Sequence, residues 1–385
     1  MRHSHTGRHF LQIPGPTNVP DRVLRAIDAP TIDHRGPEFA QLGHELLDGL
    51  HAIFRCDGPV VIYPSSGTGA WEAALVNTLS PGDRVLAYET GHFATLWRAM
   101  AERLGLEVVW LEGDWRHGVD PERVADALDG SIRAVMVVHN ETSTGVTSRV
   151  PEVRAAMDGT GSDALLLVDT ISSLGSIDYR HDEWGVDVTV GCSQKGLMLP
   201  PGLGLNALSE KALAAARSAR MPRSYWDWAP ILEANRAGFW PYTTATNLLF
   251  GLREAIAMLK EEGLENVFAR HRRHAEATRA AVRAWGLEVV CLDEREHSAS
   301  LTAVLAPEAD AIRRVTLERF NMSLGAGLGR LAGRAFRIGH LGDFNDLMLA
   351  GTLCGVELGL RAAGVPVAHG VEAALERLAT EPVAV

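Results

Sequence analysis

Two ionisable side chains follow apolar runs of the sequence, where an isolated charge is costly. Asp169 ends the run "LLLVD", and Lys195 follows the run "VDVTVGC" in a loop of small residues, "SQKGL". A carboxylate at the carboxyl end of a buried strand lies where open α/β sheets bind ligands. A partly desolvated lysine has a lowered pKa and can act as an amine nucleophile. A lone lysine is more often a solvated surface charge, so the catalytic interpretation of Lys195 depends on Asp169 lying one strand crossover before it.

A turn of small residues, "SSGTG" at 65–69, lies between an apolar run and a helical pattern. Free backbone N–H groups, hydroxyls and the helix dipole at such a position suit a phosphate. The Walker pattern GxxxxGK[ST] is absent, and an ordinary glycine-serine turn with a helix cap is the alternative explanation. The turn, Asp169 and Lys195 together indicate one ligand site.

These residues need a sheet whose strand ends meet, and the hydrophobic pattern predicts one. Apolar runs typical of strands alternate with helical patterns from residue 58 to residue 197, with the strand before Asp169 expected at 164–168. Such alternation favours a mainly parallel sheet with right-handed crossovers. A long helical region then leads to three further strand candidates, which are "LEVVCL", "LTAVLA" and "AFRIGHLG".

Composition excludes several classes of partner. The 385 residues are 46% apolar and 22% charged, and the net charge is −11, so no basic field attracts nucleic acid or an anionic membrane. No apolar stretch reaches the length of a membrane span. The four cysteines are scattered without a CxxC pair, which predicts no disulfide framework, no metal site and a reducing cytoplasmic location. They are Cys56, Cys192, Cys291 and Cys354.

The motifs resemble those of the class V aminotransferases, a group of fold type I pyridoxal phosphate enzymes that includes serine-glyoxylate and alanine-glyoxylate transaminases. The resemblance covers nearly the whole chain, and the motifs match in order and spacing. It implies an α/β fold, with a large domain around a mainly parallel seven-stranded sheet at 1–250 and a smaller α+β domain at 251–385. The motifs are "IPGPTNVP", "DHRGPEF", "SSGTGAWEAALVNTLSPGD", "GHFATLW", "HNETSTGV", "LLVDTISSLGS", "GCSQKGLMLPPGL", "PYTTATNLLFGL" and "FRIGHLGD".

The resemblance implies pyridoxal 5′-phosphate as the cofactor and gives each matching residue a task. Lys195 would hold the cofactor covalently and then carry the substrate proton. Asp169 would pair with the pyridinium nitrogen, whose positive charge explains why the sheet tolerates a buried carboxylate. Phe93 would stack on the ring, with ordinary core packing as the alternative, and Thr142 would hydrogen-bond the phenolic oxygen. The phosphate cup would be lined by Ser66, Gly67, Thr68 and Gln194.

The substrate site is also inferred from the resemblance. Arg337 would clamp the substrate α-carboxylate, because a guanidinium offers a rigid fork of donors. A surface ion pair with Asp343 is the alternative for this arginine. The backbone around Gly15, Pro16 and Asn18 would fold over the substrate.

A neighbouring subunit reaches the phosphate in this family, and the segment "WPYTTATN" matches the part that does so. Tyr242 and Thr243 would be its donors, which implies a homodimer with shared active sites. The expected reaction moves an amino group from a small amino acid, with serine favoured, to a 2-oxo acid, glyoxylate. Aspartate-glyoxylate, alanine-glyoxylate and ureidoglycine-glyoxylate transaminases share these motifs and remain alternatives. A cysteine desulfurase is a remote alternative, because it needs a mobile cysteine nucleophile.

Overall fold

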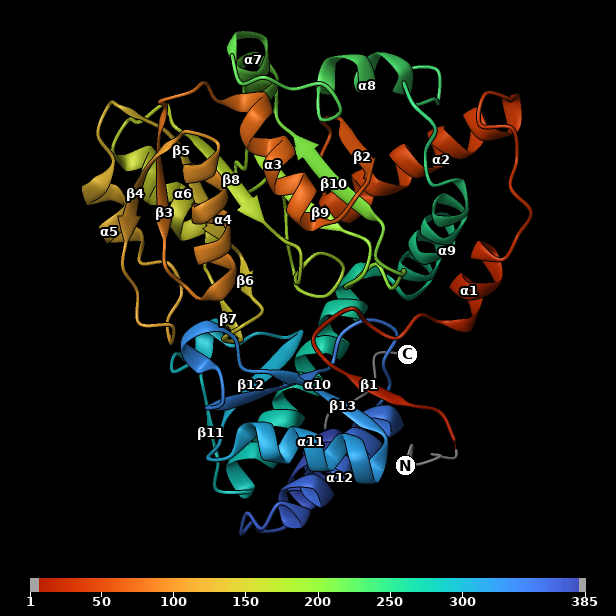
Figure 1. Cartoon of the computed structure of the whole chain (residues 1–385), viewed down its shortest axis with the longest axis vertical. Coiled ribbons are helices and arrows are strands. Elements are labelled where there is room, and N and C mark those ends of the chain that lie inside the picture. Colours follow the sequence, from red (N-terminus) through yellow and green to blue (C-terminus); the bar gives the residue numbers. More distant parts are fainter. Residues whose placement is uncertain (1–6, 381–385) are drawn as a thin grey trace.

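The computed structural model describes residues 7–380, which fold around two main β-sheets of different size. In Figure 1 the larger sheet and its helices form the upper part of the molecule, and the smaller sheet with its own helices forms the lower part. Each part packs its apolar side chains into a separate main core. None of the helices within 7–380 is long and apolar enough to cross a membrane.

The larger sheet has seven strands and is mainly parallel. In spatial order they are β2 (Val60–Pro64), β10 (Leu203–Leu208), β9 (Val188–Cys192), β8 (Leu165–Asp169), β5 (Ile132–Val138), β3 (Arg84–Tyr88) and β4 (Glu107–Leu111). Only β10 runs antiparallel to its neighbours within this sheet. Central parallel strands are buried on both faces, which explains their continuous runs of valine, leucine and isoleucine.

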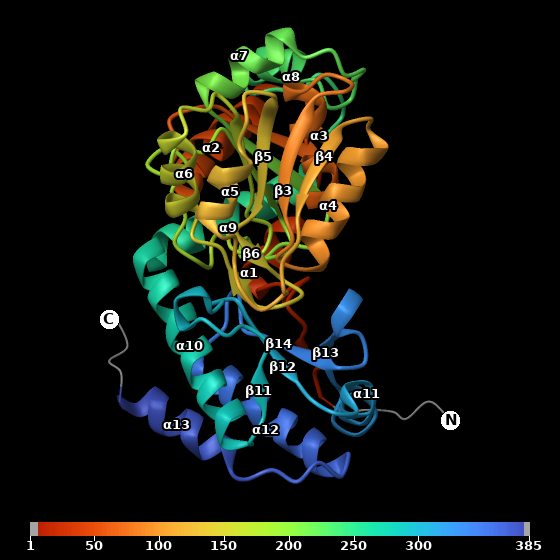
Figure 2. The ribbon, with the colours of Figure 1, turned by 90° about the vertical axis from the view of Figure 1, so that its left-hand side faces the viewer.

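The helices of the larger part surround this sheet, and most of them cover its two faces. They are α1 (Asp21–Ile27), α2 (Pro37–Phe54), α3 (Gly67–Thr78), α4 (His92–Arg103), α5 (Pro121–Ala127), α6 (Val150–Gly159), α7 (Glu210–Ser218), α8 (Trp228–Asn235) and α9 (Thr246–Glu262). Figure 2 shows α3 and α4 on one face, with α2, α5 and α6 on the other. A short hairpin of β6 (Asn140–Glu141) and β7 (Val146–Thr147) follows β5 and carries the motif "HNETSTGV".

The smaller sheet has five strands and takes one of them from the beginning of the chain. In spatial order they are β1 (Phe10–Gln12), β13 (Met322–Ala326), β14 (Ala335–Gly339), β12 (Leu301–Leu305) and β11 (Glu288–Val289). β1 pairs in parallel with β13, so Phe10 lies opposite Met322. The chain therefore crosses from the smaller sheet into the larger part immediately after β1, through the segment that contains Gly15.

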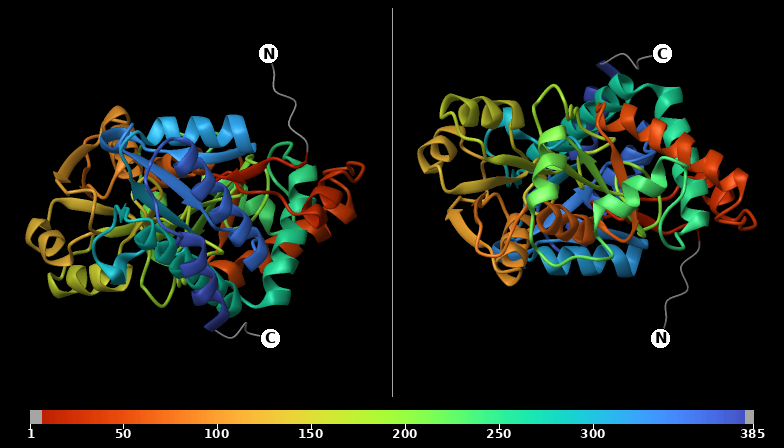
Figure 3. Two further views of the ribbon diagram at one scale, coloured as in Figure 1. Left: turned by 90° about the horizontal axis from the view of Figure 1, so that it is seen from below. Right: turned by 90° about the horizontal axis from the view of Figure 1, so that it is seen from above.

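The helices of the smaller part form its outer layer, as the view from below in Figure 3 shows. They are α10 (Leu264–Ala284), α11 (Ala309–Phe320), α12 (Asp346–Ala362) and α13 (Gly370–Thr380). α9 and α10 are separated by Gly263 alone, whose φ of 82° lies in the left-handed region that glycine adopts without strain. The long helical region expected from the sequence is therefore two helices that meet at a bend.

The expected fold class is confirmed, since the larger sheet has seven mainly parallel strands and the smaller sheet is mixed. The strand before Asp169 lies one residue later than expected, at 165–169, so the carboxylate belongs to its last residue. Sequence reasoning did not locate β1, β10 or β13. β10 contains a glycine and the buried Asn206, which interrupt the apolar pattern. The domain boundary at residue 250 falls inside α9 and stays a prediction.

Candidate active site

Most of the expected site residues line one cavity of about 220 Å³. They reach it from the carboxyl ends of β8 and β9, the N-termini of α3 and α4, the hairpin of β6 and β7, and the crossing segment after β1. These residues are Gly15, Pro16, Ser66, Gly67, Thr68, Phe93, Thr142, Asp169, Gln194 and Lys195. Its other wall residues are Trp71, Leu96, Asn140, Ile171 and Pro201. A wider surface groove of about 910 Å³ beside α5 and α6 contains none of the expected site residues.

The phosphate turn has the backbone of an anion site. Ser66 is the N-cap of α3 in an extended conformation, and its side chain makes no capping hydrogen bond. The first N–H groups of a helix have no acceptor within the helix, so those that begin at Gly67 point toward the cavity end of α3. The side-chain oxygen of Gln194 is buried and has no hydrogen-bond partner within residues 7–380.

Asp169 lies at the carboxyl end of β8 and is 3% exposed. One carboxylate oxygen accepts a hydrogen bond from the backbone N–H of Ile171 at 2.6 Å. The other accepts one from the indole N–H of Trp71 at 3.0 Å. Burial, together with the nearby Glu141 carboxylate, raises the pKa of Asp169 to about 7, against the lowering effect of these two hydrogen bonds. A positive ligand charge at this position would stabilise the ionised form.

Lys195 follows β9 and is 8% exposed. Burial lowers the pKa of its amine to about 8, and the neighbouring positive charge of Arg337 acts in the same direction. The amine donates a short hydrogen bond to the carbonyl oxygen of Pro14. Gly15 has a φ of 103°, and a Cβ atom there would collide with the Lys195 side chain. Only glycine lets the crossing segment approach the amine this closely.

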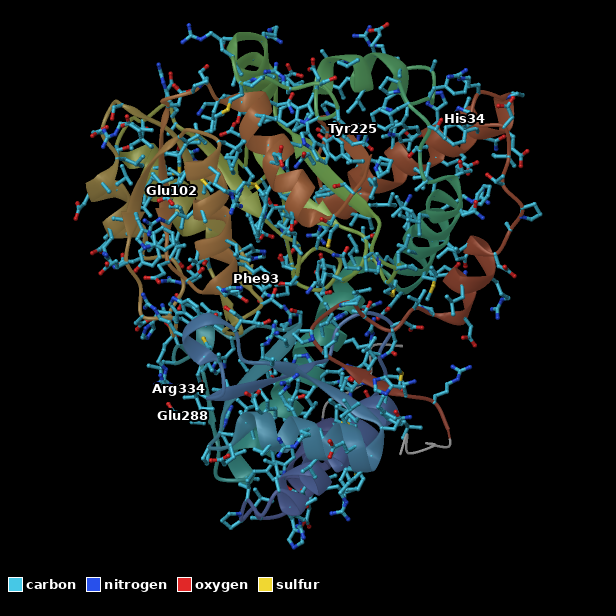
Figure 4. The ribbon with its side chains drawn as sticks, in the orientation of Figure 1. His34, Phe93, Glu102, Tyr225, Glu288 and Arg334 are labelled. Carbon is cyan, nitrogen blue, oxygen red and sulfur yellow. The ribbon has the colours of Figure 1, made fainter. Side chains whose placement is uncertain are left out.

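Phe93 is the second residue of α4 and is half-buried in the cavity wall. Figure 4 shows it at the end of α4 that faces the smaller part. The N-cap of this helix, Gly91, has no side chain to cap the first turn. The carboxylate of Glu141 caps it instead, accepting hydrogen bonds from the backbone N–H groups of Phe93 and Ala94, each at 3.1 Å.

Thr142, in the turn between β6 and β7, and Arg337, in β14, link the two parts of the molecule. The Nη1 of Arg337 donates to the carbonyl oxygen of Thr142 at 2.8 Å, and its Nε donates to that of Ala326 at 2.7 Å. The arginine is 7% exposed and lies beside the cavity, outside its wall. The hydroxyl of Thr142 donates to Ser172 at 2.8 Å. Arg337 is therefore not the surface ion pair with Asp343 that was the alternative from sequence.

Three expected residues lie away from this cavity. The side-chain amide of Asn18 donates to the carbonyl oxygen of Leu11 at 3.1 Å, so it supports the crossing segment from outside. Tyr242 stacks on Tyr225, with ring centroids 4.7 Å apart. Figure 4 places Tyr225 in the upper part of the molecule, well separated from Phe93. Thr243 is exposed beside this aromatic pair.

Two residues that hold the site in shape were not predicted from the sequence. Glu141 caps α4, and Trp71 donates to Asp169. Glu141 is fully buried, yet it stands inside a quoted motif and was not singled out. Its acidic side chain in an otherwise small and polar loop was the available signal. Trp71 also stands inside a quoted motif, but nothing in a sequence shows that an indole N–H reaches a carboxylate 98 residues later.

The residues present fit pyridoxal 5′-phosphate. The cofactor carries a phosphate, a ring nitrogen that is protonated when paired with an acid, and a carbonyl that reacts with an amine. The cavity offers a helix N-terminus, a buried carboxylate and a buried amine. Each ligand group therefore has a chemically matched partner.

Comparison with known proteins gives consistent matches over the length of the chain. The family model for class V aminotransferases matches residues 9–317. The serine–glyoxylate aminotransferase of Methylorubrum extorquens is 48% identical, over 98% of this chain and 98% of that protein. The L-aspartate–glyoxylate aminotransferase of Paracoccus denitrificans is 43% identical, over 96% of each. The crystal structure of ureidoglycine–glyoxylate aminotransferase from Bacillus subtilis has a TM-score of 0.90 at 28% identity, covering 98% of this chain and 100% of that one.

Proposed function

Because the chain belongs to the class V aminotransferase family, we propose that it transfers the amino group of serine to glyoxylate, which gives glycine and a 2-oxo acid. The observation that carries this proposal is the cavity that joins Lys195, Asp169 and the N-terminus of α3. The relative at 48% identity is named for serine and glyoxylate, which supports this choice of substrates.

Class V aminotransferases depend on pyridoxal 5′-phosphate, which when bound withdraws electrons from the substrate α-carbon and carries the amino group between the two half-reactions. In our proposal the α3 end of the cavity binds the phosphate. Asp169 holds a positive charge on the ring nitrogen, and Phe93 packs against the ring face. The phosphate-binding residues in this assignment are Ser66, Gly67, Thr68 and Gln194.

Lys195 is the proposed covalent anchor and general base. An amine with a pKa of about 8 is partly unprotonated near neutral pH, so it can accept the α-proton of a substrate and return it to another atom. Its contact with the carbonyl oxygen of Pro14 fixes the amine at the crossing segment. The same segment, through Gly15 and Pro16, closes one side of the cavity and limits the access of water.

Arg337 is the proposed clamp for the substrate carboxylate. Its Nε and Nη1 are held by two backbone carbonyl oxygens, which fix the plane of the guanidinium beside the cavity. A fixed fork orients a carboxylate with little loss of side-chain entropy. Burial lowers the pKa of Arg337 to about 10, so the group is charged at neutral pH. Both substrates carry a carboxylate next to the reacting carbon, so one clamp serves both half-reactions.

We also propose that the protein is a homodimer with shared active sites and that it is located in the cytoplasm. Tyr242 stacks on Tyr225 and has a buried hydroxyl, and Thr243 beside it is exposed. Both lie away from the cavity of their own chain, which is the placement needed if they serve a partner subunit.

Two alternatives differ in chemistry. The relative at 43% identity is named for aspartate, which makes aspartate the second candidate donor. A desulfurase needs an accessible cysteine at the cofactor, but none of the four cysteines lines the cavity. Cys192, the one nearest in sequence to Lys195, is buried, and burial raises the pKa of its thiol to about 12. A buried neutral thiol is a poor nucleophile.

A substrate panel tests the proposal. The purified enzyme with added cofactor is offered serine, aspartate and alanine as donors, and glyoxylate, pyruvate and 2-oxoglutarate as acceptors. We expect kcat/KM to be highest for serine with glyoxylate. Preference for aspartate would change the donor assignment, and preference for 2-oxoglutarate would overturn the glyoxylate assignment.

In Arg337→Ala, KM should rise by about 30-fold or more for donor and acceptor alike, because a charge-assisted pair is lost. Arg334→Ala, at an exposed position of the smaller part (Figure 4), is the matched control.

A further inference from the structure

Trp71 reaches from the phosphate-binding helix to the carboxylate at the end of β8. It lies in the second turn of α3, is 2% exposed, and lines the cavity. Its indole N–H donates to Asp169 at 3.0 Å. α3 therefore carries both the end of the cavity that suits a phosphate and the donor that holds the acid at the other end.

The indole is itself fixed by a second tryptophan. Trp71 stacks on Trp97 of α4, with ring centroids 5.7 Å apart and planes within 12°. Trp97 is also buried, and its own indole N–H has no hydrogen-bond partner within residues 7–380. The stack joins α3 to α4, the helix that carries Phe93. Of the two indoles, only that of Trp71 donates a hydrogen bond within residues 7–380, and the acceptor is the carboxylate of Asp169.

Asp169 depends on this donor because few groups compensate its charge. Within residues 7–380 its side chain accepts hydrogen bonds from two residues, Ile171 and Trp71. The charged groups around it are the carboxylate of Glu141, which disfavours its ionised form, and the amine of Lys195, which favours it. The thiol of Cys192 nearby is neutral. A buried carboxylate with two donors loses much of its stabilisation when one is removed.

We propose that Trp71 is a positioning residue, whose indole N–H orients the Asp169 carboxylate toward the cofactor ring and ties that orientation to the phosphate-binding helix. The proposal rests on the role of Asp169 in the proposed function. It is independent of which amino acid is the donor. Trp71 acts on the cofactor through Asp169, so its effect must disappear when Asp169 is absent.

The test compares Trp71→Phe with Trp97→Phe. Both variants replace a buried tryptophan with phenylalanine, whose ring can still stack. Only Trp71→Phe removes an indole N–H that donates a hydrogen bond. Equilibrium dialysis of the holoenzyme measures the Kd of pyridoxal 5′-phosphate. We expect Trp71→Phe to raise this Kd about tenfold and to lower kcat by a similar factor with little change in donor KM. Trp97→Phe should stay within about twofold of the parent. Equal Kd values in the two variants would overturn the proposal.

A double-mutant cycle with Asp169→Ala separates positioning from packing. In the Asp169→Ala background, Trp71→Phe should cause no further change in the Kd, because the bond it removes is already gone. A further tenfold loss would show that Trp71 acts through packing alone. If Asp169→Ala by itself leaves the Kd unchanged, the assigned role of Asp169 fails and this proposal fails with it. A different preferred donor in the substrate panel leaves the cycle unaffected.

The Trp71 indole N–H resonance gives a readout that does not depend on the folding of a Trp71 variant. In the full-length holoenzyme, a proton bonded to a carboxylate is expected far downfield, and Asp169→Ala should move it upfield. The Trp97 resonance should not move with it. An unchanged Trp71 resonance would contradict the hydrogen bond on which the proposal depends.

Discussion

Two carboxylates are buried at neighbouring strand ends of the larger sheet, and the protein treats them differently. Glu141 follows β5 and Asp169 ends β8, and these strands pair in parallel. Within residues 7–380, Glu141 accepts hydrogen bonds from the backbone N–H groups of three residues and from one hydroxyl. Asp169 accepts two. Only Asp169 lines the cavity.

The difference shows how to distinguish a structural buried charge from one that is available to a ligand. The donors around Glu141 all come from the chain and leave its charge compensated, so it holds the first turn of α4 in place. Asp169 lines the cavity and keeps acceptor capacity that no group within residues 7–380 uses. Changes at Asp169 should therefore affect catalysis, whereas changes at Glu141 should affect stability first.

The largest effect is expected at Lys195, the cation that shares the cavity with Asp169. Lys195→Ala should lower turnover by at least about four orders of magnitude, as the loss of a covalent anchor and base does. The chain should still fold, because a buried amine contributes little net stability. Single-turnover kinetics and circular dichroism measure both properties. Lys260→Ala, at an exposed position of α9, is the control and should keep full activity. Full activity in Lys195→Ala would remove this residue from the mechanism.

Asp169→Asn should give the next largest effect. The rate of α-proton removal should fall by roughly three orders of magnitude, because the neutral amide cannot hold a positive charge on the ring nitrogen. The free energy of unfolding of the cofactor-free chain should not fall and should rise near pH 7, because the amide removes the cost of ionising a poorly compensated buried carboxylate. Stopped-flow measurements and urea unfolding separate the two quantities. A rate within twofold of the parent would make Asp169 a structural residue like Glu141.

Glu141→Gln should have the opposite balance of effects, with a larger loss of stability than of catalytic rate. The amide NH₂ group would face backbone N–H donors, so one acceptor is lost at the start of α4, and stability should fall by about 2 to 3 kcal/mol. The rate should fall only about tenfold, through displacement of Phe93. Urea unfolding measures the loss of stability, and kcat measures the loss of rate. Glu102→Gln, at an exposed position of the same helix (Figure 4), is the control. A larger loss of rate than in Asp169→Asn would invalidate the comparison.

The sequence predicted the parts of the site that follow from chain order, and it missed those that depend on tertiary contacts. Lys195 and Asp169 each follow a strong strand pattern, so their meeting at one sheet edge could be foreseen. The bond from Trp71 to Asp169 joins residues far apart in the chain and depends on side-chain direction. Asn18 stands inside a matching motif, yet its amide turns to the carbonyl oxygen of Leu11, away from the cavity. A motif fixes where the backbone passes, but local packing decides where each side chain points.

The smallest effect is expected from a buried base, His139, close in sequence to the buried acid Glu141. His139 lies between β5 and Glu141, is 2% exposed, and packs against the rings of Tyr179 and Trp184. Burial lowers its pKa from 6.5 to about 4. Between these values the unfolded chain binds a proton that the folded chain does not, so stability falls as the pH falls from about 6.5 toward 4.

Asp169 acts in the opposite direction, because burial raises its pKa from 3.8 to about 7 and the folded chain binds the extra proton. Its contribution is present below pH 3.8 and is lost as the pH rises through about 7. As the cofactor-free chain is acidified from about pH 6.5 to pH 5, His139 alone should lower its free energy of unfolding by up to about 1.4 kcal/mol per pH unit, and Asp169 should cancel most of this loss. Urea unfolding measures the net change. In Asp169→Asn the offset is absent, so the loss of stability on acidification should become steeper. A loss that is shallower in Asp169→Asn than in the parent would contradict a protonated Asp169 in the folded, cofactor-free chain, and with it the distinction from Glu141.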